Sequence, residues 1–105
     1  MDKDRRVAFR YSFTAQAELI DELTSTRVVS RVCDLSLYGC RLEMANPFPD
    51  DSLATLRITV GNDTFQASVR MIYSHANASS GVEFVDVKSE DQALLERWLA
   101  QAATP

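Results

Sequence analysis

Two short stretches of the 105-residue sequence carry side chains whose types and spacing could bind an anion or a nucleobase. The first is RRVAFR at residues 5–10, in which Arg5, Arg6 and Arg10 bring three guanidinium groups close together. Each guanidinium can make two parallel, charge-assisted hydrogen bonds to a phosphate or to O6 and N7 of guanine. Because short charge clusters are often only solvated tails, an anion clamp and a basic tail are both open interpretations of this stretch.

The second stretch is DLSLYG at residues 34–39, which combines a carboxylate, a hydroxyl and a glycine. The Asp34 carboxylate can accept hydrogen bonds from N1–H and N2–H₂ of guanine, Ser36 can bind a phosphate or an amino group, and Gly39 lets backbone approach closely. The same residue types favour a tight turn, because Asp34 and Ser36 can bind neighbouring backbone N–H groups and Gly39 can adopt a positive φ. A turn and a purine-binding loop are therefore both open interpretations here.

Other chemistry finds little support in the sequence. Cys33 and Cys40 flank the second stretch, so a disulfide is geometrically feasible in a hairpin, but two reduced, half-buried thiols fit a cytosolic protein better. A zinc site needs about four nitrogen or sulfur ligands, and only His75 could supplement the two thiols, so we reject a metal site. Neither a nucleophile-elbow serine nor a glycine-rich phosphate loop is present. We therefore expect a binding protein and not an enzyme.

Composition and charge restrict the class of protein. The length fits one domain, and the hydrophobic share of 46% and charged share of 25% are those of an ordinary globular protein. A net charge of −4 argues against DNA or RNA binding, which normally requires a basic face. No apolar run reaches the roughly 18 residues of a membrane span, and the charged N-terminus leads into no signal-peptide core. We therefore expect a cytoplasmic protein without membrane insertion.

Most of the chain has the patterns of short β-strands. Residues 13–19 alternate between apolar and polar side chains, which is the period of a half-buried strand. Apolar alternation or β-branched residues predict further strands over 27–35, 40–44, 53–60, 65–71 and 82–87. Two prolines make 45–51 a loop, and 74–81 is expected to be a polar loop. The sequence GND at 61–63 predicts a hairpin turn in which one of its first two residues takes a positive φ.

The C-terminal region changes to a helical pattern. Ser89 is a candidate N-cap with Gln92 three residues later, the spacing of a capping box. An apolar stripe follows at helical spacing, formed by Leu94, Leu95, Trp98 and Leu99. We expect this stripe to close one end of a small antiparallel β-barrel, which six or so short strands and one helix predict. Residues 1–10 are too polar to fold alone, so a flexible N-terminal segment is expected before a barrel and helix over 11–105.

The order of these motifs resembles the PilZ domain family. R-x-x-x-R at residues 6–10 precedes the first strand, and D-x-S-x-x-G at 34–39 lies between the second and third. GVEF at 81–84 is similar to the family's late glycine–aromatic strand. The resemblance extends from Arg5 to the terminal helix. It implies an all-β fold with one terminal helix, in which a six-stranded antiparallel β-barrel is closed by the helix and binds the bacterial second messenger cyclic di-GMP.

The resemblance also implies roles for individual residues. Arg6 and Arg10 would grip guanine and phosphate. Asp34 and Ser36 would make the polar contacts of the second motif, while Gly39 would keep the turn open. The resemblance therefore implies that residues 34–39 are both a turn and a binding loop, a turn whose polar groups face a nucleotide.

Arg5 lies directly before R-x-x-x-R, a position that in this family helps to decide whether one or two nucleotides bind. As a third cation it could neutralise the phosphates of a stacked pair and lie against a guanine face, so two ligands per chain are expected. The implied function is a stand-alone receptor, with no cofactor besides its ligand, that changes conformation and relays occupancy to an unidentified effector protein. The alternative is a protein-interaction module of the same fold that binds no ligand, as in some pilus-associated members.

Overall fold

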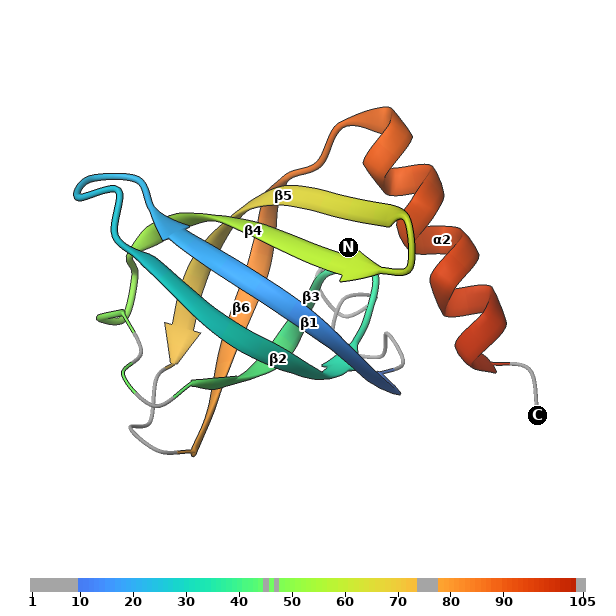
Figure 1. Cartoon of the computed structure of the whole chain (residues 1–105), viewed down its shortest axis with the longest axis horizontal. Coiled ribbons are helices and arrows are strands. Elements are labelled where there is room, and N and C mark those ends of the chain that lie inside the picture. The colour runs from blue at the N-terminus through green and yellow to red at the C-terminus, as the bar shows by residue number, and fades with distance from the viewer. Residues whose placement is uncertain (1–9, 45, 47, 74–77, 104–105) are drawn as a thin grey trace, which may run out of the picture.

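Six β-strands form a closed barrel with one α-helix at its end, in the computed structural model of the chain (Figure 1). The structure describes residues 10–44, 46, 48–73 and 78–103. The elements are β1 (Tyr11–Asp21), β2 (Arg27–Leu35), β3 (Gly39–Met44), β4 (Leu53–Val60), β5 (Asp63–Tyr73), β6 (Ala78–Asp86) and α2 (Ser89–Ala103). Neighbouring strands are antiparallel throughout, and β1 pairs with β4 to close the order β1-β2-β3-β6-β5-β4. The expected antiparallel barrel with a C-terminal helix is confirmed.

The strands form because their apolar residues alternate, so that one face of each strand points into the barrel. In β1, Ala15, Ala17 and Leu19 are buried while Gln16 between them is exposed, as the sequence pattern predicts. The other strands contribute further fully buried side chains, among them Val32, Leu35, Leu42, Leu56, Ile58, Phe65, Val69 and Met71. Burial of each such side chain stabilises the fold by about 1.5–3 kcal/mol. This interior holds the outward-facing residues of the strands in position.

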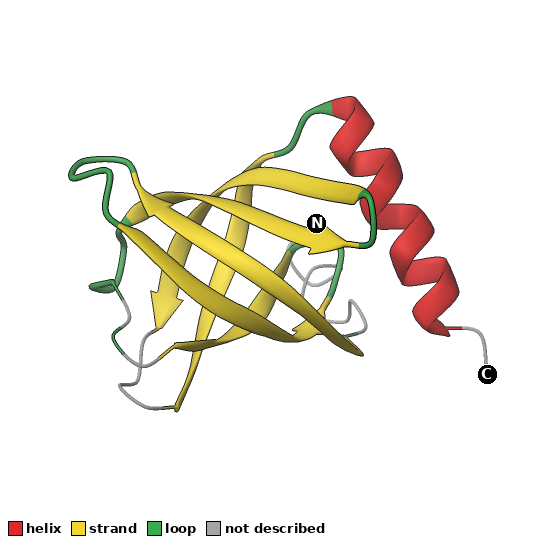
Figure 2. Cartoon of the chain, in the orientation of Figure 1, coloured by secondary structure: helices red, strands yellow, loops and turns green. Residues whose placement is uncertain are grey.

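Helix α2 covers the end of the barrel at which β1 and β5 begin (Figure 2). Leu95, Trp98 and Leu99 are buried, and the centroid of the Trp98 rings lies 5.5 Å from that of Phe13 and 6.3 Å from that of Phe65. Because Phe13 is near the start of β1 and Phe65 near the start of β5, the apolar stripe closes this end, as expected. No helix in the described part of the chain is long and apolar enough to cross a membrane.

The start of α2 differs from the predicted capping box. The backbone N–H of Gln92 donates to the carbonyl of Lys88 at 2.8 Å, so Lys88 and not Ser89 takes the N-cap position. The Gln92 side chain donates to Glu96 at 3.0 Å, one turn further along the helix. Asp91 in the first turn stabilises the helix, because its negative charge lies near the positive N-terminal end of the helix dipole.

Strand β6 begins at Ala78, inside the stretch 74–81 that the sequence predicted as a polar loop. Ser80 pairs with Leu42 of β3, and its side chain is fully buried. The predicted loop was wrong over these residues because small polar residues are typical of turns, whereas here they occupy positions inside a sheet. His75, for which the sequence suggested no role, lies outside the described residues.

The turn between β4 and β5 confirms the predicted hairpin. Val60 pairs with Asp63, which leaves Gly61 and Asn62 as a two-residue turn. Gly61 has a φ of 60°, a conformation that glycine adopts without a steric penalty. A glycine with positive φ at the first turn position matches the right-handed twist of the strands that it joins.

Candidate functional site

Asp34 near the end of β2 joins the two stretches that carry the candidate binding groups. Its Oδ1 lies 3.3 Å from Nη1 of Arg10, directly before β1, and its Oδ2 lies 2.8 Å from Nε of Arg41 in β3. Strand β2 lies between β1 and β3, and Asp34 pairs with Ser12 on one side and with Arg41 on the other. The structure therefore brings Arg10 and Asp34 together, as a shared binding site requires.

The two arginines hold Asp34 with different strength. The side chain of Asp34 is 15% exposed, whereas those of Arg10 and Arg41 are 52% and 40% exposed. Exposed ion pairs contribute about 0–1 kcal/mol, so Arg10, with its longer bond, can leave Asp34 at little cost. The hydrogen bond to Asp34, together with the charge of that carboxylate, raises the pKa of the Arg41 guanidinium above its usual value. Arg41 is therefore the firmer partner of Asp34.

Ser36 uses its hydroxyl to build the turn between β2 and β3. The oxygen accepts hydrogen bonds from the backbone N–H groups of Tyr38 and Gly39, each at 3.2 Å. The hydroxyl donates to the carbonyl of Gly39 at 3.1 Å, and the backbone N–H of Ser36 donates to the same carbonyl at 2.9 Å. Ser36 is buried. Ser36 lies two residues after Asp34 in the chain. Its hydrogen bonds therefore fix the shape of the loop next to the Asp34 carboxylate.

Gly39 is required by close packing of β3 against β6. A Cβ built on Gly39 would lie 2.1 Å from the carbonyl oxygen of Val82, a distance that atoms of a folded backbone do not tolerate. Of the three glycines, only Gly61 has a positive φ. The expectation that Gly39 turns the chain by a positive φ was therefore wrong. The close approach seen here is between β3 and β6, and the approach of backbone to a nucleotide at Gly39 stays a prediction.

Arg41 was not predicted as a site residue. Its position depends on the register of the β2–β3 pair, in which Leu35 lies opposite Cys40 and Asp34 lies opposite Arg41. An antiparallel hairpin assumed across the turn would have indicated this pair, since residues on both sides of a turn face each other. The next residue across the sheet is Gly81, over which the ring of Tyr73 lies, because a Cβ on Gly81 would be 2.3 Å from Cε2 of Tyr73.

Two of the candidate residues cannot be placed. Arg5 and Arg6 lie outside the described residues, as does most of the N-terminal segment expected over 1–10. The described part of that segment is Arg10 alone, and the barrel begins at Tyr11. The structure thus brings together Arg10 and Asp34, places the turn of the second motif beside them, and adds Arg41.

The two cysteines are separate thiols. Cys33 is half-buried and Cys40 is buried, and both are free. Burial raises the pKa of each thiol above its usual value, and the Glu43 carboxylate raises that of Cys33 further. Protonated thiols are weak nucleophiles and weak metal ligands. Within the ranges that the structure describes, no cluster of three or more His, Cys, Asp or Glu side chains could hold a metal ion.

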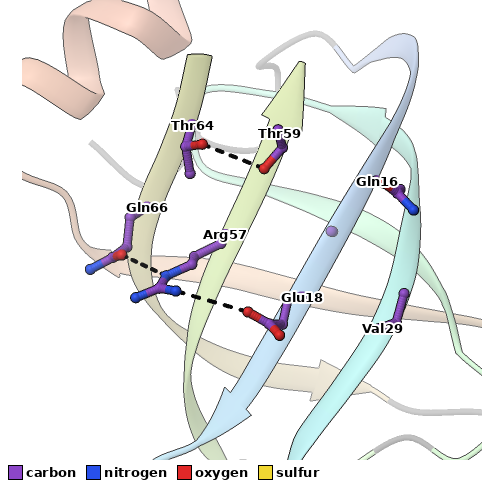
Figure 3. A pocket seen from close by; sticks show the side chains of 8 residues that line it. Gln16, Glu18, Val29, Arg57, Thr59, Thr64 and Gln66 are labelled. Carbon is purple, nitrogen blue, oxygen red and sulfur yellow. Dashed lines mark hydrogen bonds and ion pairs between the residues drawn. The ribbon is translucent and has the colours of Figure 1, made fainter. Parts of the chain in front are cut away.

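An open depression of about 450 Å³ lies across β1, β2, β4 and β5 (Figure 3). Its polar side chains contact one another, with Nη1 of Arg57 4.0 Å from Glu18 and Nε of Arg57 donating to Gln66 at 2.9 Å. The hydroxyls of Thr59 and Thr64 are 3.5 Å apart. Of the candidate binding residues that the structure describes, Arg10, Asp34, Ser36 and Gly39, none lines this depression. We therefore place the candidate site at Asp34.

A family model described as PilZ domain matches residues 4–101 of the chain. No match to the chain was found among curated protein sequences. The matched range includes both the arginine stretch from Arg5 to Arg10 and the turn of the second motif. It also includes β1 to β6 and most of α2.

Solved structures share the barrel. The PilZ domain of CeSA from a cellulose-synthesizing bacterium has a TM-score of 0.74 and 17% identity, and the match covers 89% of this chain and 96% of that one. The PilZ domain of YcgR from Escherichia coli, solved with c-di-GMP, has a TM-score of 0.75 and 18% identity, with coverages of 93% and 91%. The Bacillus subtilis inhibitor of motility, MotI/DgrA, has a TM-score of 0.76 and 13% identity, covering 92% of this chain and 50% of that one. On the family match over nearly its whole length and on this shared barrel, the chain belongs to the PilZ domain family.

Proposed function

We propose that this chain is a receptor for cyclic di-GMP. The observation that carries the proposal is the contact between Arg10 and Asp34, which links the two motifs at one place on the barrel. The family relation supports it, since the YcgR domain of the same family was solved with c-di-GMP. The proposed ligand-binding residues are Arg5, Arg6, Arg10, Asp34, Ser36 and Gly39.

Asp34 is suited to recognise the guanine base. A carboxylate accepts hydrogen bonds at both oxygens, and guanine offers N1–H and N2–H₂ side by side as donors. In the free protein Arg10 occupies Oδ1 of Asp34. A guanine that takes this oxygen displaces Arg10, whose guanidinium then becomes available for a phosphate of the same ligand. Binding thereby exchanges one weak ion pair for a base contact and a phosphate contact.

Ligand binding orders residues 1–10 in this proposal and so produces a signal. The segment holds only Val7, Ala8 and Phe9 as apolar side chains next to its arginines. Three such side chains are too few to offset a backbone ordering cost of about 1–2 kcal/mol per residue. The arginines also repel one another until the phosphates of the ligand neutralise them. An ordered segment changes the surface beside the barrel, and an effector protein can recognise this change.

Backbone ¹⁵N relaxation tests the ordering step. The order parameters of residues 2–10 are expected to rise when cyclic di-GMP is added, because the ligand ties the arginines to the barrel. Strand β5 pairs with neither β1 nor β2 and serves as the internal reference, with order parameters that stay constant. Equal order parameters of residues 2–10 with and without ligand would contradict this step and leave the binding itself intact.

A ligand-independent interaction module of the same fold is the second candidate function. The turn itself favours it, because Ser36 bonds groups within its own loop and Gly39 is explained by the packing of β3 on β6. Both residues thus have structural roles that need no nucleotide. This module would give no heat of binding with cyclic di-GMP, so a titration with that ligand separates the two candidates.

Isothermal titration of cyclic di-GMP into the chain is expected to show saturable binding of two ligands per chain. Arg5 supplies the third cation that a stacked pair of dinucleotides needs to balance its phosphates. Arg5→Ala should therefore reduce the stoichiometry to one equivalent, while Arg27→Ala, which removes a partner of Glu18, should leave it at two. A parent chain that does not bind would refute the receptor function. Saturation at one equivalent in both the parent and Arg5→Ala would refute only the two-ligand arrangement.

A further inference from the structure

Arg41 of β3 contacts Asp34 but belongs to neither of the two sequence motifs. Its Nε donates to Oδ2 of Asp34 at 2.8 Å, and its backbone pairs with Asp34 in β2 and with Gly81 in β6. The side chain thus starts from a central position in the sheet and is 40% exposed. We infer that Arg41 is a further binding residue of the nucleotide site that selects guanine together with Asp34, an inference that rests on the receptor function proposed above.

Arg41 has most of its hydrogen-bond donors unused. A guanidinium has five N–H donors in one plane, and toward the described residues Arg41 uses only the N–H of Nε. Arg70, by contrast, donates to Glu83 through both Nε and an Nη group. Five further arginines in the described ranges contact their carboxylate through an Nη atom, namely Arg10, Arg27, Arg31, Arg57 and Arg97. Arg41 is therefore anchored at Nε, and neither of its Nη groups makes a hydrogen bond within the described part of the chain, which leaves both for a ligand in this inference.

The bond between Arg41 and Asp34 persists when a ligand displaces Arg10. The bond from Arg10 is longer and its side chain more exposed, so Arg10 is the partner that gives way. Each carboxylate oxygen has about two acceptor positions, so Oδ2 can hold Nε of Arg41 and a guanine N–H at once. Arg41 thereby holds the Asp34 carboxylate in one orientation while the guanine base takes the place of Arg10.

This arrangement distinguishes guanine from adenine. The pairing edge of guanine presents two donors, N2–H₂ and N1–H, followed by the acceptor O6. In this inference Asp34 accepts from the two donors, and an Nη group of Arg41, whose Nε holds Oδ2, donates to O6. Adenine has the donor N6–H₂ in place of O6 and an unprotonated N1. In adenine the N6–H₂ donor would therefore face the donors of Arg41, and the N1 lone pair would face the Asp34 carboxylate. A binding site rejects a ligand that leaves its polar groups unpaired.

Arg41→Gln and Arg41→Lys test the inference, with calorimetric titration of cyclic di-GMP and of cyclic di-AMP. Arg41→Gln is expected to lower the affinity for cyclic di-GMP by roughly 10- to 100-fold, because charge-assisted bonds to the base and to Asp34 are lost. Its preference for cyclic di-GMP over cyclic di-AMP should fall as well. Arg41→Lys keeps the charge but lacks the planar fork of donors, so it should recover only part of the affinity and of the preference.

Arg27→Gln is the matched control. Arg27 pairs with Glu18 at 2.9 Å, and a second arginine, Arg57, approaches the same carboxylate at 4.0 Å. Glu18 and Arg57 appear side by side on neighbouring strands in Figure 3. This cluster repeats the arrangement of a carboxylate between two arginines on a part of the barrel without either motif. Removal of the Arg27 charge by Arg27→Gln should leave the affinities for both dinucleotides unchanged.

The possible results separate this inference from the proposed function. Affinity and selectivity equal to the parent in Arg41→Gln, or in Arg41→Lys, would overturn the role of Arg41 in guanine selection while the receptor function stands. A parent chain that binds neither dinucleotide would refute the receptor function and this inference with it. Circular dichroism melting shows whether each variant folds. If Arg41→Gln does not fold, Arg41→Lys decides, because it retains a cation beside Asp34.

Discussion

Replacing Arg10 with alanine is expected to reduce the affinity for cyclic di-GMP by roughly 100-fold while leaving the barrel folded. A hydrogen bond to a charged group contributes about 1.5–3 kcal/mol, and a guanidinium can make two such bonds to one phosphate or base. The contact of Arg10 with Asp34 is long and exposed, so its loss should lower the free energy of unfolding by only about 0–1 kcal/mol. Arg41 still neutralises Asp34 in this variant.

Arg6→Ala should lose affinity to a similar extent, although Arg6 lies outside the described residues. Isothermal titration measures the affinities, and urea unfolding measures the stabilities. Arg31→Ala provides the control, because Arg31 also pairs with a carboxylate, that of Glu43, and is similarly exposed. Unchanged affinity in both Arg6→Ala and Arg10→Ala would show that the arginine motif does not bind the nucleotide.

Gly39→Ala is expected to destabilise the fold by about 3 kcal/mol, at the upper end of the cost of overpacking. The new Cβ would lie 2.1 Å from the carbonyl oxygen of Val82 and 3.1 Å from Cα of Glu83. Both are backbone atoms of β6, which cannot rotate away as a flexible side chain can. The methyl group can be accommodated only if β3 moves away from β6, which disrupts the pairing that holds these strands together. Urea unfolding followed by tryptophan fluorescence measures the change.

Gly61→Ala is the matched control for this variant. Nothing lies within 4 Å of a Cβ on Gly61, but its φ of 60° is unfavourable for alanine. This backbone strain costs about 1–2 kcal/mol, less than the clash at Gly39. A Gly39→Ala variant as stable as the parent, or more stable than Gly61→Ala, would contradict the close approach of β3 and β6. Because Gly39 supports the turn next to Asp34, ligand binding by its variants is to be compared with the parent only for the fraction of molecules that the urea data show to be folded.

The sequence alone determined the strands whose signal is local. Apolar alternation and a high content of β-branched residues are properties of the strand itself, and such local signals correctly predicted β2 over 27–35 and β4 over 53–60. The same reasoning failed at the start of β6, where Ser80 and its small neighbours have the composition of a loop. They form a strand because β3 offers partners for their backbone, and β5 joins the pairing at Gly81. A partner elsewhere in the chain leaves no local pattern in the sequence.

The candidate site divides in the same way. Residue type and spacing in the sequence indicated Arg10, Asp34, Ser36 and Gly39, because carboxylates, hydroxyls, guanidinium groups and glycine have fixed chemical capacities. Only the tertiary structure decided how each is used. Asp34 meets Arg41 through the register of β2 with β3. Position 39 requires a glycine because the backbone of β6 lies against it, and not because its φ is positive. Register and close packing join residues that are distant along the chain, and for that reason the three-dimensional fold determines them.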